Sequence, residues 1–484
     1  MVVNFGKTFI VGFEGEELTE ELASKLKKID PAGIILFDTN LKNSEKVKKL
    51  NSDLKALLGD DLFISVDQEG GKVQRLRNVS YELPSLLSVG ITSRNSTNEN
   101  SFIFSREVLI NYSKALAHQL KELGFNFVYG PCADLNIEKT NPIIGSRSLG
   151  DDYRIVSEQL KVIIEELKKE NILTCAKHFP GHGDSKKDSH KELPVISRSV
   201  TEELISLKPF IAAIEAGVDS IMIAHLLLEI EHAISLDSGF IDESDVSKEE
   251  LKKLRLIESS SNIATSLNKE LISKELVYLL GFKGLIVSDE ITMKALSEYG
   301  NYTELAKELM EAGNHLVIWN SNIDDALEAC QKLNSLEQDD YKDLFNSYQK
   351  SMEKIQLCRS SLKESASLKD YSYDEDYFVD LVLKSFESET KPDFKDIDII
   401  LINKHPKLEI DKIEQAFNKP VDFISRNFKH ESRQNFLIIL FQANIDDLYN
   451  LEKIKLENKV FQVSTDIHDP GSHMNIRGAG LLHY

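Results

Sequence analysis

Cysteine is scarce in this chain, and the cysteines it has form no motif. Among 484 residues there are four, Cys132, Cys175, Cys330 and Cys358, and they are scattered without C-x-x-C spacing. This scattered arrangement argues against both a zinc knuckle and a disulfide framework. We therefore expect the protein to belong to a reducing compartment.

The chain also lacks long apolar runs. No segment is long enough to cross a bilayer. The apolar run near the N-terminus is interrupted by Gly12, Glu14 and Glu16, which makes it too short and too acidic for a secretory signal. These features predict a cytoplasmic protein that does not associate with membranes.

Basic residues are in the minority. The chain has 58 Lys and Arg against 79 Asp and Glu, a formal net charge of −21 that would repel a nucleic acid over most of the surface. A neutral or locally captured substrate fits better. Hydrophobic residues make up 41% and charged residues 28%, as in ordinary globular proteins, and the length predicts two or three domains.

Short apolar runs alternate with longer amphipathic stretches over the first 335 residues. This rhythm is typical of successive βα units around a parallel sheet. We expect helices over 44–58, 106–123, 153–170, 201–216 and 268–280, and strands over 7–13, 33–37, 62–66, 125–130, 172–177, 219–225, 284–289 and 315–319. Eight such units favour a (β/α)8 TIM-type barrel, although the rhythm alone leaves an open doubly wound sheet possible.

Polar residues follow the ends of five predicted strands. In a barrel, these positions converge on the mouth at the carboxyl ends of the strands, where barrel enzymes carry their chemistry. The residues are Asp67, Glu69, Asp134, Asn136, Lys177, His178, His225, Asp289 and Glu290. We expect Glu290 to point away from the mouth and to pack or cap.

The chain divides into three parts. Residues 1–338 form the predicted catalytic barrel, 339–366 a polar helical linker, and 367–484 a smaller α/β domain of unknown role with apolar runs at 397–403, 435–442 and 459–464. Within the barrel, an acidic connection of about forty residues follows His225, far longer than a usual βα loop. It is either a solvated insertion or an active-site lid.

The stretch KHFPGHGDSKKDSH, residues 177–190, is unusually rich in ionisable side chains. His178 and His182 stand four apart, but Pro180 and the flanking glycines forbid the helix that would align them as metal ligands. His182, Asp184, Asp188 and His190 could still bind zinc from a loop. We favour instead proton transfer, with no metal or other cofactor.

Proton transfer needs an oriented histidine and a partner across the pocket. In the tripeptide DSH, the Asp188 carboxylate can orient the His190 imidazole, which then serves as acid and base in turn. Asp289, at the predicted end of the seventh strand, faces the mouth and can attack a substrate. This pair fits retaining glycoside hydrolysis through a covalent glycosyl-enzyme intermediate.

Four segments together resemble glycoside hydrolase family 3, and more narrowly its bacterial β-N-acetylglucosaminidases of cell-wall recycling. They are KHFPGHGDSKKDSH, VDQEGGKVQRL (66–76), NPIIGSRSLG (141–150) and VSDEITMKAL (287–296). The resemblance implies that Asp289 is the nucleophile and that His190 with Asp188 is the acid/base dyad. It also assigns sugar binding to Asp67, Arg75, Arg147, Lys177 and His178.

The chain departs from this subgroup at two positions. SDE (288–290) stands where SDD is usual, and AGNH (312–315) stands where Asp commonly ends the motif. The resemblance implies a small carbohydrate substrate, such as N-acetylglucosaminides or muropeptides, and leaves the oligomeric state open. A phosphorylase remains an alternative, because a neutral histidine does not repel incoming phosphate as a carboxylate would. A non-catalytic sugar-binding barrel is another.

Overall fold

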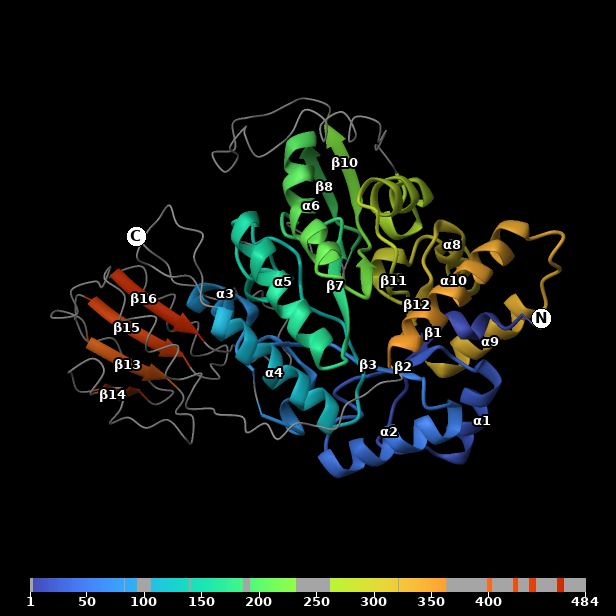
Figure 1. Cartoon of the computed structure of the whole chain (residues 1–484), viewed down its shortest axis with the longest axis horizontal. Coiled ribbons are helices and arrows are strands. Elements are labelled where there is room, and N and C mark those ends of the chain that lie inside the picture. Colours follow the sequence, from blue (N-terminus) through green and yellow to red (C-terminus); the bar gives the residue numbers. More distant parts are fainter. Residues whose placement is uncertain are drawn as a thin grey trace.

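The computed structural model (Figure 1) describes residues 3–81, 83–93, 106–138, 141–185, 192–231, 262–320 and 322–362, together with four strands between 398 and 464. The expected acidic connection after His225 falls largely on residues 232–261, which lie outside the described residues. All four cysteines are described and none forms a disulfide.

Eight parallel strands close into a barrel at the centre of the main body (Figure 1). In spatial order they run β1-β12-β11-β9-β7-β6-β3-β2. Their bounds are Phe9–Val11 (β1), Gly33–Leu36 (β2), Phe63–Val66 (β3), Phe127–Val128 (β6), Leu173–Phe179 (β7), Ser220–Ile223 (β9), Leu285–Glu290 (β11) and Leu316–Trp319 (β12). Each overlaps one of the eight predicted strands, so the barrel is confirmed and the open sheet is excluded.

Alternate residues of each strand face opposite sides of the barrel wall. On β9, Met222 belongs to the inner apolar cluster with Phe63 and Leu285, whereas Ile221 and Ile223 belong to the outer cluster beneath the helices. This period of two explains why the strands read as continuous apolar runs, since both faces are buried.

Helices cover the outside of the barrel (Figure 1). The main ones are α1 (Glu20–Ile29), α2 (Ser44–Leu58), α3 (Leu86–Ser93), α4 (Arg106–Glu122), α5 (Tyr153–Lys169), α6 (Val200–Glu215), α8 (Tyr302–Ala312) and α9 (Ile323–Asn334). The predicted helix at 268–280 is a π-helix, η6 (Leu271–Leu279). Gly124, Gly217, Gly281 and Gly313 follow helices with positive φ, as their positions predict.

A parallel pair of short strands outside the barrel, β8 and β10, was not expected from the sequence. β8 (Val195–Ser199) pairs in parallel with β10 (Leu227–Glu231), and Figure 1 shows the pair beside α6. The helix α6 and the barrel strand β9 lie between the two strands in the chain and bring them together. Neither strand therefore signals the pairing locally. The first residues of the connection after His225 are therefore a strand rather than an irregular loop.

A long helix, α10 (Lys342–Ser361), lies within the predicted helical linker. Ile355 joins the inner apolar cluster of the barrel, and Phe345 and Tyr348 pack edge-on against Phe5 with ring centroids 5.4 and 5.1 Å away. The Arg359 guanidinium donates to the Ala32 carbonyl at 2.8 Å. Since these contacts are with the barrel, α10 closes one of its ends.

Four parallel strands follow in a separate sheet with the order β14-β13-β15-β16. They span Asp398–Ile402 (β13), Val421–Ile424 (β14), Asn435–Leu440 (β15) and Lys459–Ser464 (β16). The three apolar runs named from the sequence correspond to β13, β15 and β16, whereas β14 was missed. Among the described helices, none is both long enough and apolar enough to span a bilayer.

Candidate active site

The strand alternation carries three charged side chains into the barrel mouth. On β3 the inward series that begins at Phe63 reaches Asp67, on β7 the series from Leu173 and Cys175 reaches Lys177, and on β11 the series from Leu285 and Val287 reaches Asp289. All three line one cavity of about 480 Å³, as do Arg75, Arg147 and His178. Six of the eight residues predicted for the site therefore share one pocket.

Lys177 and Arg147 are held by two carboxylates. The Lys177 ammonium lies 2.6 Å from Asp67 Oδ1 and 2.7 Å from Glu69 Oε1. Arg147, from the short helix η3 (Gly145–Arg147), donates to both Glu69 oxygens at 2.8 and 2.9 Å. Since Glu69 is fully buried and binds both cations, it fixes the positions of their charged ends.

These ion pairs keep Glu69 and Lys177 charged. Burial alone would raise the pKa of Glu69, but Arg147 and Lys177 outweigh it and hold that pKa well below its usual range. Burial likewise opposes the charge on Lys177, yet Asp67 and Glu69 raise its pKa. The pocket thus offers fixed ionic donors and acceptors, which suit the hydroxyl groups of a sugar.

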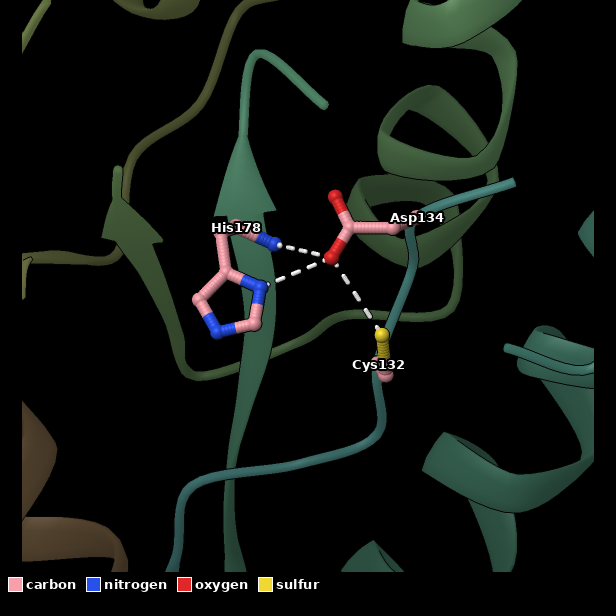
Figure 2. Close-up of side chains that lie close together, drawn as sticks. All are labelled: Cys132, Asp134 and His178. Carbon is pink, nitrogen blue, oxygen red and sulfur yellow. Dashed lines mark hydrogen bonds and ion pairs between the residues drawn. The ribbon is translucent and has the colours of Figure 1, made fainter. Parts of the chain in front are cut away.

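His178 is oriented by Asp134, as Figure 2 shows. Its Nδ1 lies 2.7 Å from Asp134 Oδ2, and its Nε2 lies 3.2 Å from Arg147 Nη2. A guanidinium can only donate, so we assign Nε2 as the acceptor and Nδ1 as the protonated nitrogen. His178 is then a neutral imidazole with both nitrogens engaged.

Cys132, Asp134 and His178 form the one cluster with metal-ligand spacing among the described residues, their ligand atoms lying within 4.8 Å of one another. In Figure 2 the Asp134 carboxylate stands between the other two side chains. Asp134 Oδ2 accepts from the Cys132 thiol at 3.3 Å, and burial raises the pKa of that thiol well above its usual range. Because the thiol stays protonated, we interpret the cluster as a hydrogen-bonded support for His178.

Arg75 enters the pocket from η2 (Arg75–Asn78), which follows the small antiparallel pair β4 (Gln68–Gly70) and β5 (Val73–Gln74). Its Nη1 donates to Asp38 Oδ2 at 3.1 Å, and its guanidinium lies 5.6 Å from the centroid of the Phe37 ring. Asp38 and Phe37 come from the segment after β2. These contacts hold a cation at the rim of the pocket.

Hydrogen bonds of Asp289 and of the next residue, Glu290, hold the end of β11 in place. Asp289 Oδ1 accepts from the Glu290 amide at 2.8 Å, while Glu290 Oε1 accepts from the Thr292 and Asn320 amides at 3.0 and 3.1 Å. The His225 Nε2 donates to the Glu290 carbonyl at 3.1 Å. Glu290 therefore caps the following turn, as expected, but it also lines the cavity, so the expectation that it points away from the mouth is wrong.

The two departures from the family pattern have structural roles. Glu290 of SDE binds the turn just described. In AGNH, His315 Nδ1 accepts from the Ile286 amide at 2.9 Å, and burial lowers the pKa of His315 to about 3. A neutral histidine therefore anchors β11, the strand that carries Asp289.

The loop after Lys177 and His178 is tightly built. A Cβ on Gly183 would lie 1.6 Å from the Leu135 carbonyl oxygen, so the backbone approaches closer than any other residue allows. Arg198 of β8 donates to the Pro180 and Gly181 carbonyls and to both Asp184 oxygens at 2.6 Å. Asp184 is thereby committed to an ion pair rather than to the zinc site considered from the sequence.

Asp188 and His190, the predicted acid/base pair, lie outside the described residues. Two residues of the pocket region, Glu69 and Asp134, received no site role from the sequence, and a third, His182, was considered only as a zinc ligand. Glu69 and Asp134 had been recognised as polar residues after strands, which is the signal that could have found them. Their partners, Arg147 and His178, stand 78 and 44 residues away, and no local pattern indicates such pairs.

Comparison with known proteins assigns the family. The model of the glycosyl hydrolase family 3 N-terminal domain matches residues 6–343. The chain belongs to glycosyl hydrolase family 3. It is a glycoside hydrolase, and the matched residues include the whole barrel and its pocket.

Curated relatives are similar to about two thirds of this chain at moderate identity. A protein named Beta-hexosaminidase from Nitrosomonas eutropha is 31% identical over 322 residues, which are 66% of this chain and 82% of that protein. A Beta-hexosaminidase from Neisseria meningitidis is 30% identical over 304 residues, 62% of this chain and 74% of the relative.

Solved structures agree on the architecture. The family 3 β-N-acetylglucosaminidase from Paenibacillus sp. str. FPU-7 is 22% identical and superposes with a TM-score of 0.67 over 95% of this chain and 83% of that chain. Native NagZ from Neisseria gonorrhoeae is 26% identical, with a TM-score of 0.54 over 76% of this chain and 99% of NagZ. At 22% identity, the first of these supports the shared fold alone.

Proposed function

We propose that this family 3 hydrolase is a retaining, exo-acting β-N-acetylglucosaminidase that removes terminal β-linked N-acetylglucosamine. The observation that carries the proposal is the Asp289 carboxylate in a cavity of about 480 Å³ whose floor is the fixed set of Asp67, Lys177 and Arg147. That volume is within the usual range of small-molecule sites. The names of the curated relatives, Beta-hexosaminidase, support an N-acetylhexosamine as the glycone.

In the proposed reaction, Asp289 attacks the anomeric carbon and forms a glycosyl ester. His190, oriented by Asp188, protonates the departing oxygen and then removes a proton from the incoming water. Retaining enzymes keep the two groups about 5 Å apart, so we expect the DSH segment to bring His190 to that distance from Asp289.

The remaining site residues hold the sugar. Asp67 and Lys177 can each bond to ring hydroxyls, and His178 and Arg147 complete the wall beside them. Because Glu69 and Asp134 fix these side chains before substrate arrives, little conformational entropy is lost on binding. Arg75, at the rim, is placed to contact the substrate where it leaves the pocket.

The test is release of nitrophenol from 4-nitrophenyl β-N-acetylglucosaminide by the purified protein. Asp289→Ala and His190→Ala should each lower kcat by a factor of about 10³ or more, while the surface variant Asp53→Ala should leave it unchanged. Asp53 is a suitable control because it is a half-exposed carboxylate paired with Lys49 on α2. Absence of release by the unaltered protein would refute the proposal.

We further propose that the natural substrates are peptidoglycan-derived muropeptides in the cytoplasm, taken up by residues 1–338 acting as the catalytic domain. Product analysis in phosphate buffer decides the acceptor. Free N-acetylglucosamine supports hydrolysis, whereas N-acetylglucosamine 1-phosphate would identify the phosphorylase that the neutral His190 also permits.

A further inference from the structure

His182 differs from every other histidine that the structure describes. Its Nδ1 and Nε2 are both buried and neither has a hydrogen-bond partner. By contrast, His118, His178, His225 and His315 each engage at least one ring nitrogen. The His182 side chain is nevertheless 2% exposed and lines the same cavity as Asp289.

The position of this ring is set by its backbone. The His182 amide donates to Asp134 Oδ1 at 2.6 Å, and its carbonyl accepts from Asn141 Nδ2 at 2.8 Å. The close packing of Gly183 on Leu135 holds the next residue. Bonds of its backbone therefore hold His182 in the cavity lining, and its ring nitrogens add no hydrogen bond to keep it there.

Buried polar atoms without partners are costly, so a protein that keeps one usually has a use for it. Burial lowers the pKa of His182 to about 4, which keeps the ring neutral above that pH. A neutral imidazole has one donor and one acceptor. That pair matches a hydroxyl or an amide and has no preference for an ionic ligand.

We propose that His182 is a further substrate-binding residue, which forms a hydrogen bond to an uncharged hydroxyl or amide group of the sugar held over Asp289. This inference rests on the proposed function, since it needs a sugar in the cavity. It also explains why the protein retains an imidazole where an apolar side chain would cost less.

Three variants and two measurements test this role. His182→Phe removes both polar atoms and His182→Gln retains a donor and an acceptor. Asn111→Ala on α4, outside the pocket lining, is the control for effects of mutation and purification that do not involve the pocket. The readouts are the affinity for N-acetylglucosamine by titration calorimetry and the melting temperature. We expect His182→Phe to weaken affinity about ten- to a hundredfold while keeping or raising Tm, and His182→Gln to recover part of the affinity.

A purely structural histidine would behave differently. If His182→Phe lowered Tm but left sugar affinity unchanged, the proposal would be overturned. If His182→Phe lowers both the sugar affinity and Tm, His182→Gln decides between the two roles. Recovered affinity supports a role in binding, whereas a recovered Tm without recovered affinity refutes it. Failure of the unaltered protein to bind or cleave N-acetylglucosaminides would instead sink the proposed function itself.

Discussion

Lys177 and Arg147 share one fully buried carboxylate, Glu69, although Lys177 also pairs with Asp67. Glu69 lies 2.7 Å from the Lys177 ammonium and binds Arg147 through both oxygens, with its side chain fully buried. Buried charges are tolerated only in such pairs. Glu69, to which the sequence assigned no role, therefore joins the two cations of the pocket.

Glu69→Gln should destabilise the protein and weaken substrate binding together. It leaves two buried cations with one carboxylate, Asp67, and breaking a buried pair typically costs about 3–5 kcal/mol. Urea denaturation at pH 7 measures the loss, and KM for the chromogenic substrate should rise. Glu45→Gln, at an exposed carboxylate on α2, is the matched control and should leave both unchanged. Equal midpoints for the two variants would contradict this reading of Glu69.

At the scale of elements, a chain of buried groups links the loop after β7 to the π-helix. Arg198 on β8 binds Asp184 of the loop and Glu203 of α6, the latter at 2.6 Å. Glu275 on η6 is also fully buried and lies close enough to Glu203 for the charge of that carboxylate to raise its pKa. Two buried carboxyl groups can face each other only if one is protonated. Burial and Glu203 raise the pKa of Glu275 well above its usual value, which identifies Glu275 as the protonated member.

This assignment predicts a pH dependence of stability. Because the folded protein keeps the Glu275 proton after the unfolded chain has lost it, stability should fall as pH rises from about 4.5 toward the raised pKa. Glu275→Gln imitates the protonated acid and should remove that part of the fall. Urea midpoints of both proteins at pH 5 and pH 8 test this. Parallel changes in the two would show that Glu275 does not carry the proton.

Element by element, the barrel could be predicted because its strands are short apolar runs separated by amphipathic helices. The same alternation that buries Leu285 and Val287 carries Asp289 inward, so one local pattern predicts both the strand and the direction of its final carboxylate. The β8 and β10 pair escaped prediction because its hydrogen bonds join segments about thirty residues apart. The π-helix also has no local signature distinguishing it from an α-helix.

For the pocket, the residue types were predictable and their partnerships were not. Asp67, Arg75, Arg147, Lys177, His178 and Asp289 line one cavity, as their motifs indicated. What escaped was the layer beneath them, Glu69 and Asp134, together with the unpaired His182. Hydrogen-bond pairing across the barrel depends on three-dimensional register, which a linear pattern does not encode.

At the scale of the whole molecule, the residues of the pocket lining that the structure describes all come from the barrel. Every residue lining the cavity lies between Ile35 and Asn320, and α10 completes the opposite end through Phe345, Tyr348 and Ile355. The structure of NagZ is 99% covered by 76% of this chain. The strands β13 to β16 therefore contribute no residue to the described pocket.

A chain ending after residue 366 should keep its hydrolase activity. The truncation retains α10 and every described residue that lines the pocket, so kcat should stay within about twofold of the full chain. A shorter variant ending after residue 338 loses α10, which should expose the inner cluster around Ile355 and lower Tm. If the 366 variant folds but is inactive, the C-terminal part has a catalytic role that this account lacks.

The most direct test of the central claim is to trap the glycosyl ester on Asp289. A 5-fluoro-N-acetylglucosaminyl fluoride forms such an ester faster than water removes it, so intact-protein mass spectrometry should show the addition of one sugar. Peptide mapping should place it on Asp289, and Asp289→Asn should remain unlabelled. Labelling of another carboxylate, or turnover of the reagent with no covalent species on an active protein, would contradict the account.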